Sequence, residues 1–222
     1  MDVGKFRRAF RRLSRAMNIV KIRETETKYQ DCEKCSLCTN REHNPHFGMG
    51  HPEGKILIVI PEPYLGKAHD LRTKDLYDNA PIQNNHRLYK PFNSLLTSAK
   101  ISKLDTYVVP TIMCPSHEGE RPAKEDILHC RDRLRETIQA FNPTVLVLCG
   151  PISYFAWYKE VPPADKEYGI LLQRKDQYIY YTRSVDNFLD LHRSKRYSEE
   201  EMKILSDEVL SNWTEIGALA RK

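Results

Sequence analysis

The sequence has no run of about 18 apolar residues, the length that a transmembrane helix requires. Its N-terminus also lacks the continuous apolar stretch of a secretory signal. Six cysteines in 222 residues are too few for a disulfide scaffold, and there are no internal repeats. These absences exclude membrane-spanning and disulfide-stapled proteins. We therefore expect a monomer without a membrane partner in a reducing compartment, either cytoplasmic or nucleoid-associated.

Positive charge is concentrated at the N-terminus. Residues 1–23 contain eight basic residues and one acidic residue, a net charge of +7, whereas the whole chain carries +5, so the remaining residues carry −2. A near-neutral body with a basic arm indicates an anionic partner such as nucleic acid. The length fits one domain with extensions.

The basic arm has the pattern of an amphipathic helix over residues 4–20. Its apolar side chains recur at steps of four and three and share one face: Phe6, Phe10, Leu13, Met17 and Val20. Its arginines are candidate phosphate contacts: Arg7, Arg8, Arg11, Arg12 and Arg15. Simple packing on the body with a solvated basic face, or a mitochondrial presequence, would give the same pattern. We expect residues 1–30 to form this helix and a charged linker, and residues 31–222 to form the main domain.

Short β-branched runs alternate with helical patterns along the main domain. Strands are expected at residues 55–60, 106–109, 144–150, 170–173 and 178–182, with the last two joined as a hairpin. Helices are expected at residues 88–99, 123–141, 151–158, 186–192 and 198–219, and a long loop at 67–86. This alternation predicts an α/β fold, a three-layer α/β/α sandwich with a four-stranded parallel sheet.

Five of the six cysteines have a spacing typical of a metal site. Cys32, Cys35 and Cys38 lie within seven residues, and thiolates two residues apart can bind one centre because a tight turn brings both sulfurs to one side. Cys114 and Cys130 follow some eighty residues later. We interpret Cys32, Cys35, Cys114 and Cys130 as one metal or iron–sulfur site that fixes the N-terminal segment to the core.

The strand at residues 55–60 ends abruptly in a proline-rich turn. Pro61 and Pro63 flank Glu62 and are followed by Tyr64, so the backbone is stiff and cannot continue the strand. In open α/β sheets, ligands bind at the carboxyl ends of strands. Glu62 and Tyr64 are therefore candidate site residues, although a plain turn with a solvated Glu62 has the same pattern.

These motifs together resemble the iron–sulfur uracil-DNA glycosylase-like superfamily, in its family-four branch. The motif C-x2-C-x-L-x3-R begins at Cys32, and Cys130 follows Cys114 by sixteen residues before the run NPTVLVLCG. The resemblance covers about residues 31–195. It implies a 4Fe–4S cluster held by Cys32, Cys35, Cys114 and Cys130, with Cys38 outside the set; zinc also accepts four thiolates.

The motifs of the active site depart from that family. The turn at Glu62 is more similar to the Gln-Asp-Pro-Tyr-His turn of general uracil glycosylases, with Glu62 at the water-activating position and Tyr64 at the tyrosine that rejects a 5-methyl group. The stacking Pro-Phe motif has no clear counterpart, because the region near Asn84 is polar. Pro110 stands where a base-reading asparagine is expected, and Arg183 stands near the expected histidine.

The resemblance implies a diverged DNA glycosylase-like hydrolase of DNA repair, acting on or recognising a flipped pyrimidine, ordinary or modified, in single- or double-stranded DNA. Glu62 would be the catalytic acid or base and Arg183 the partner of the leaving base, with Tyr64, Asn84 and Pro110 at the pocket. Further phosphate contacts would come from one loop: His117, Arg121 and Lys124. The alternatives are a non-catalytic iron–sulfur module that binds nucleic acid and a zinc-stapled interaction domain.

Overall fold

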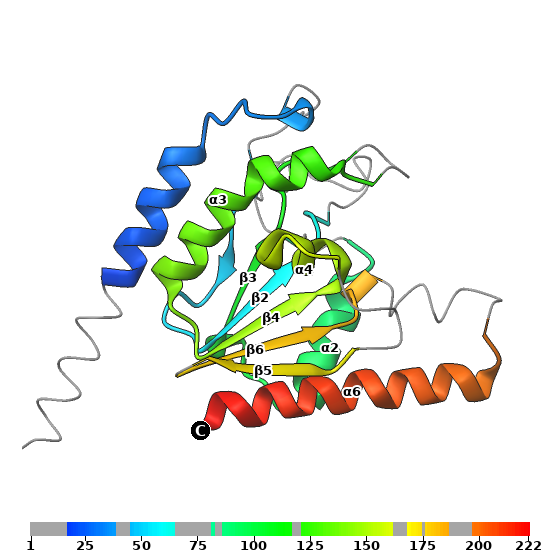
Figure 1. Cartoon of the computed structure of the whole chain (residues 1–222). Helices are drawn as coiled ribbons and strands as arrows, with labels where there is room; N and C mark the ends of the chain where they lie inside the picture. The colour runs from blue at the N-terminus through cyan, green and yellow to red at the C-terminus, as the bar shows by residue number, and fades with distance from the viewer. Residues whose placement is uncertain are drawn as a thin grey trace, which may run out of the picture.

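A six-stranded sheet forms the centre of the protein in this computed structural model (Figure 1). The structure describes residues 17–38, 45–64, 81–82, 86–116, 121–161, 168–174, 176–186 and 197–222. The strands follow the order β1-β3-β2-β4-β6-β5 across the sheet. Their bounds are β1 (Met49–Gly50), β2 (Ile56–Ile60), β3 (Thr106–Pro110), β4 (Val145–Cys149), β5 (Ile170–Arg174) and β6 (Gln177–Thr182).

The sheet is mixed, so the prediction of a four-stranded parallel sheet was incomplete. The central strands β3, β2, β4 and β6 are parallel to their neighbours, whereas β1 and β5 are antiparallel at the two edges. The connection from β5 to β6 is too short for a crossover, which forces an antiparallel hairpin. Strand β1 has two residues, too few to leave a periodic pattern in the sequence.

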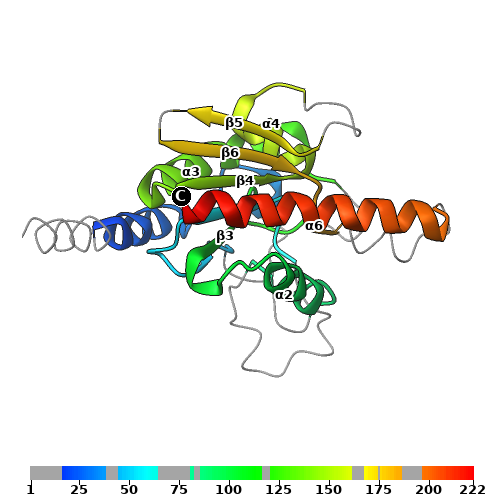
Figure 2. The same cartoon turned by 90° about the horizontal axis from the view of Figure 1, so that it is seen from below.

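Helices cover both faces of the sheet, which gives the three layers that the sequence predicts. They are α2 (Tyr89–Ser98), α3 (Lys124–Phe141), α4 (Gly150–Tyr158) and α6 (Glu199–Arg221). Alternate strand residues face opposite sides. Leu57 and Val59 of β2 pack with α3 and α4, whereas Ile56, Ile58 and Ile60 pack with α2 and α6. Figure 2 shows α6 running across the face opposite α3 and α4.

A further helix packs outside α3 and is described from residue 17 to residue 29. The charged linker that the sequence predicts after residue 20 is therefore largely helical. The buried side of this helix carries Ile22 and Tyr29, whereas Met17 and Val20 are 54% and 56% exposed. The predicted apolar face was thus wrong at these two positions, because α3 offers its packing surface to Ile22 and Tyr29 instead.

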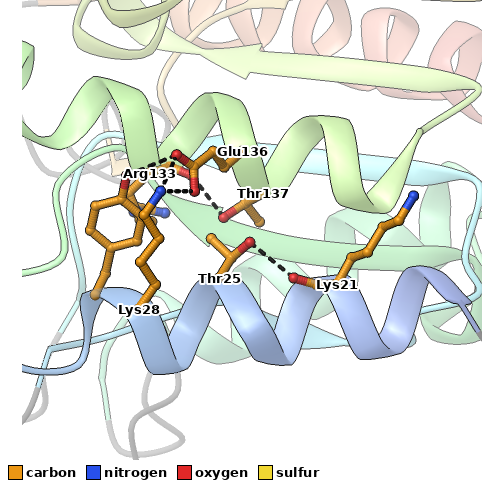
Figure 3. Close-up of polar contacts among 7 residues, drawn as sticks. Lys21, Thr25, Lys28, Arg133, Glu136 and Thr137 are labelled. Atoms are coloured by element: carbon orange, nitrogen blue, oxygen red, sulfur yellow. Dashed lines mark hydrogen bonds and ion pairs between the residues drawn. The ribbon is translucent and has the colours of Figure 1, made fainter.

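Polar contacts border this helix pair (Figure 3). The Lys28 ammonium lies 2.7 Å from a Glu136 carboxylate oxygen, and the Tyr29 hydroxyl donates to the same carboxylate at 3.1 Å. At the other end, the Asn18 amide donates to the Phe141 carbonyl at 3.2 Å. The segment before the first cysteines is thereby fixed against α3.

The described residues leave some expectations without a structural outcome. Most of the predicted loop at residues 67–86 and most of the predicted helix at residues 186–192 lie outside them. Among the described residues, no helix combines the length and the apolar character that crossing a membrane requires.

Candidate functional site

The carboxyl ends of the parallel strands meet at one edge of the sheet. Ile60 at the end of β2 pairs with Pro110 at the end of β3, and Cys149 at the end of β4 pairs with Thr182 at the end of β6. Residues just beyond these ends, Glu62 and Arg183 included, therefore share this edge, as the sequence predicts.

Glu62 is half-buried in the turn that follows β2. Its carboxylate accepts a hydrogen bond from the backbone N–H of Ser116 at 3.0 Å. Ser116 lies two residues after Cys114, in the loop that follows β3. This contact orients the carboxylate, and it also ties the turn to a loop that carries one of the predicted metal ligands.

Tyr64 is buried beside a group of polar side chains. Its ring stacks on His86, with centroids 5.4 Å apart and planes inclined by 28°. Burial raises the pKa of Tyr64, and the charges of Asp186 and Glu62 raise it further. Within the described residues, its hydroxyl has no hydrogen bond of good geometry, although Ser184 and Asp186 lie near enough to act on its pKa.

His86, Ser184 and Asp186 complete this polar group. Ser184 donates a hydrogen bond to Asp186, and a Cβ on Gly150 would lie 2.7 Å from the Ser184 Cβ, so glycine allows this close approach. Gly150 has a positive φ of 79°. Burial lowers the pKa of His86, as does the charge of Arg87, against the opposing charge of Asp186. An imidazole near a carboxylate is suited to proton transfer near neutral pH.

Pro110 and Arg183 lie at the same edge but have other contacts. The Pro110 carbonyl accepts a hydrogen bond from Arg133 at 2.6 Å, and the proline ring is buried. The Arg183 guanidinium pairs with Glu208 of α6 at 3.4 Å and lies over the ring of Tyr168 at 4.5 Å. Arg183 therefore contacts Glu208 and Tyr168 rather than Glu62. Asn84 lies outside the described residues.

The four predicted metal ligands gather on the α3 side of the sheet. Cys114 and Cys130 are buried in the core, and Cys32 and Cys35 pack against it, half-buried. Burial raises the pKa of the Cys35 thiol, and the nearby Cys130 and Asp126 raise it further. Burial also raises the pKa of Cys130, on which Cys32 acts in the same direction. Among the described residues, none of the four forms a disulfide.

Asp126 holds the first cysteines against α3. Its carboxylate accepts hydrogen bonds from the Ser36 hydroxyl at 3.3 Å and from the backbone N–H of Ala123 at 3.2 Å. Ser36 directly follows Cys35, so the contact places Cys35 near the helix that carries Cys130. The cysteine loop is therefore positioned by a buried carboxylate.

The four thiols are candidate ligands for either a cluster or a single ion. Among the described side chains, no group of three or more His, Cys, Asp or Glu is arranged to hold a metal ion. Four thiolates can bind a 4Fe–4S cluster or a single zinc. Beside them lies the fully buried cation Arg133, a charge suited to an anionic thiolate-bound group.

The predicted phosphate contacts are described only in part. Arg121 and Lys124 are exposed at the start of α3. The five arginines of the arm and His117 lie outside the described residues. A hollow of about 400 Å³ lies between the N-terminal helix and α3, lined by Lys21, Thr25 and Gln139 among others, away from the strand ends. Neither Glu62 nor Tyr64 lines this hollow.

Fold and site together define an α/β protein with a candidate ligand site at the carboxyl ends of its parallel strands and a group of thiols at one side. A 120-residue stretch is 26% identical to a protein described as a type-4 uracil-DNA glycosylase from Archaeoglobus fulgidus. The match covers 54% of this chain and 54% of that protein, so the chain spans about half the length of the curated relative it matches. No family model matches the chain. This distant, partial similarity suggests the uracil-DNA glycosylase-like superfamily.

Sequence reasoning did not identify four residues that the structure places near these sites: His86, Ser184, Asp186 and Arg133. Arg133 was detectable, because it follows Cys130 by three residues and therefore lies on the same helical face. His86 and Asp186 had no comparable pattern in the sequence.

Proposed function

We propose that this protein is a diverged iron–sulfur DNA glycosylase-like protein that acts on a flipped, modified pyrimidine in DNA. The supporting observation is the half-buried Glu62 carboxylate, fixed by the Ser116 N–H and placed beside Tyr64 at the carboxyl edge of the sheet. A fixed carboxylate at this place can orient water or stabilise positive charge on the sugar as the base departs. The similarity to a type-4 uracil-DNA glycosylase supports DNA as the partner.

In this proposal Tyr64 and His86 bound the base pocket, and Asn84 and Pro110 lie near it. Arg183 serves the departing base if its side chain leaves Glu208 and Tyr168. Cys32, Cys35, Cys114 and Cys130 hold a 4Fe–4S cluster, whose contribution is to fix the loop after β3 for DNA. We further propose a monomer within the cell.

The experiment is an abasic-site assay on single- and double-stranded oligonucleotides that carry uracil, hydroxymethyluracil or other modified pyrimidines. We expect product with at least one base, and we expect Glu62→Gln to lower the rate by roughly 10²- to 10⁴-fold. The control is Glu160→Gln, an exposed carboxylate just beyond α4. Equal rates in the two variants would remove Glu62 from the chemistry, and absence of product with every base would reject the enzyme.

The second candidate is a non-catalytic iron–sulfur module that binds nucleic acid. It is favoured by Tyr64, which is only 7% exposed and is stacked on His86, and by Arg183, which is paired elsewhere. This candidate would be supported if the protein binds DNA without forming abasic product and Glu62→Gln binds DNA with the same affinity. A zinc-stapled interaction domain is the third candidate; it predicts a colourless protein with one zinc and no iron.

We propose that the basic arm binds phosphates through Arg7, Arg8, Arg11, Arg12 and Arg15, together with His117, Arg121 and Lys124. Truncation of residues 1–16 removes these five arginines and leaves the described part of the helix in place. We expect weaker DNA binding and a shallower fall of affinity with salt, since each lost phosphate contact lowers the slope of log K against log salt by about 0.9 on duplex DNA. An unchanged slope would show that the arm packs on the body of the protein and does not bind phosphates.

A further inference from the structure

Arg133 lies in the interior of α3, between the cysteines and the sheet. It is 1% exposed and is among the largest fully buried side chains. One terminal nitrogen of its guanidinium donates to the carbonyls of Pro110 at 2.6 Å and Thr111 at 2.9 Å. The Nε–H has no hydrogen-bond partner in the described part of the chain. Arg133 therefore has two satisfied donor contacts at the end of β3 and one unsatisfied donor.

The charge of Arg133 is also uncompensated. Cys130 lies one turn before Arg133 on the same face of α3, and Cys114 lies three residues after Thr111, whose carbonyl accepts from Arg133. Within the described residues no carboxylate pairs with the guanidinium. A buried cation without an anionic partner is strongly destabilising, and a guanidinium does not escape the problem by losing its proton. Both cysteines are predicted metal ligands.

We infer that Arg133 is the buried counter-charge and N–H donor to the iron–sulfur cluster, an inference that rests on the proposed cofactor. Thiolates in place of thiols supply the negative charge that the guanidinium lacks, and their sulfurs accept the free Nε–H. Charge-assisted hydrogen bonds to sulfur tune reduction potential and ligand orientation in such centres. Arg133 is a positioning residue, because it acts on the reaction only through the cysteines and the backbone.

The same guanidinium connects the cysteines to the sheet edge. Its other contacts, the Pro110 and Thr111 carbonyls, lie where β3 ends, and the Thr111 N–H in turn donates to the Ile60 carbonyl at 2.7 Å. Ile60 is two residues before Glu62. The cluster side of α3 and the turn that presents Glu62 are thus bridged by one buried cation.

The test compares Arg133→Gln and Arg133→Lys with a matched control, Arg131→Gln. Arg131 also bonds two carbonyls, those of Ala156 and Trp157, from the same helix, but its pKa responds to Arg135 and Asp132 and not to a cysteine. The proteins are purified without oxygen, iron and sulfide are quantified, and the reduction potential and the rate of iron loss to a chelator are measured. Circular dichroism checks that each variant is folded.

We expect Arg133→Gln to lower the reduction potential, because removal of a nearby cation favours the oxidised, less negative centre. We also expect iron loss roughly ten- to a hundredfold faster than in the wild type, the usual effect of removing a hydrogen-bonding partner of a ligand. Arg133→Lys keeps the charge, so its reduction potential and its rate of iron loss should lie between those of Arg133→Gln and the wild type. Arg131→Gln should match the wild type in both quantities. Equal behaviour of the Arg133 and Arg131 variants would overturn the inference.

A measurement on the wild-type protein covers the case in which Arg133→Gln does not fold. Protein labelled with ¹⁵N in the arginine guanidinium groups is brought to a paramagnetic redox state, and pulsed electron paramagnetic resonance is used to detect coupling to ¹⁵N. A coupling that is lost in Arg133→Lys supports the Nε–H contact, whereas its absence in the wild type rejects it. Wild-type protein without iron and sulfide would instead reject the proposed cofactor, so the two failures are distinguishable.

Discussion

Tyr64 and Tyr180 are both buried phenols, but their hydroxyls differ in their surroundings. The Tyr180 hydroxyl lies 2.8 Å from a Glu215 carboxylate oxygen and 3.2 Å from the Asn212 side-chain oxygen, so it donates to one of them. The Tyr64 hydroxyl has no hydrogen bond of good geometry among the described residues, although Ser184 and Asp186 lie close to it. A buried polar atom without a well-formed hydrogen bond costs stability, so its retention calls for an explanation such as a ligand.

The substitutions Tyr180→Phe and Tyr64→Phe should therefore change the free energy of unfolding by different amounts or in opposite directions. We expect Tyr180→Phe to lower the free energy of unfolding by about 1 kcal/mol, the usual net value of one hydrogen bond. Tyr64→Phe should leave it unchanged or raise it slightly, since the removed hydroxyl is unsatisfied. Urea unfolding followed by circular dichroism gives both values. A larger loss in Tyr64→Phe than in Tyr180→Phe would show that the Tyr64 hydroxyl is bonded in solution.

At the scale of elements, the N-terminal helix is attached to α3 by two kinds of contact. Ile22 is 3% exposed and belongs to the core that contains Leu134 and Ile138. Lys28 is paired with Glu136, but 59% of its side chain is exposed (Figure 3). Hydrogen bonding to Glu136 raises the pKa of Lys28, yet solvent screens so exposed a pair.

We expect the apolar contact of Ile22 to stabilise the attachment of the N-terminal helix more than the Lys28–Glu136 pair does. Ile22→Ala should lower the free energy of unfolding by about 2–4 kcal/mol, or release the helix in a separate early transition, because it leaves a cavity. Lys28→Met should change it little, and far less than Ile22→Ala does. Thermal unfolding measured in both variants, with amide exchange of residues 17–29, tests this. A stronger effect of Lys28→Met would assign the attachment to the ion pair.

At the scale of the whole molecule, the burial of tyrosine hydroxyls makes the free energy of unfolding decrease at alkaline pH. Burial raises the pKa of Tyr64, Tyr107 and Tyr180, with further increases from Asp186, Glu26 and Glu215 respectively. An acid whose pKa is raised on folding stabilises the native state fully below its unfolded pKa, which is about 10 for tyrosine. That contribution is lost as the pH rises through the folded pKa.

We therefore expect the free energy of unfolding to fall as the pH is raised above about 10. Urea titrations between neutral pH and pH 11 measure the fall. Tyr180→Phe is the internal control, since a protein with one perturbed phenol fewer should show a shallower decline. A decline of the same steepness in that variant would mean that lysines or thiols control the alkaline transition.

Much of the fold followed from the sequence, because it rests on local patterns. Central strands such as residues 56–60 and 145–149 are continuous apolar runs, and Pro61 and Pro63 end the first of them at Glu62. The spacing of Cys32 and Cys35 points to a metal by itself. The resemblance to the glycosylase-like superfamily rests on the same residues.

The tertiary structure decided the remaining features, each of which depends on contacts between distant segments. The two-residue strand β1 exists only because β3 offers a free edge, and the buried side of the N-terminal helix is set by α3 rather than by its own apolar periodicity. Likewise, Glu62 was visible in the sequence, but its hydrogen bond from Ser116, the stacking of Tyr64 on His86 and the contact of Arg133 with Pro110 were not. Sequence patterns record local conformation and burial, whereas the direction and the partner of a polar side chain are set only when segments far apart in the chain pack together.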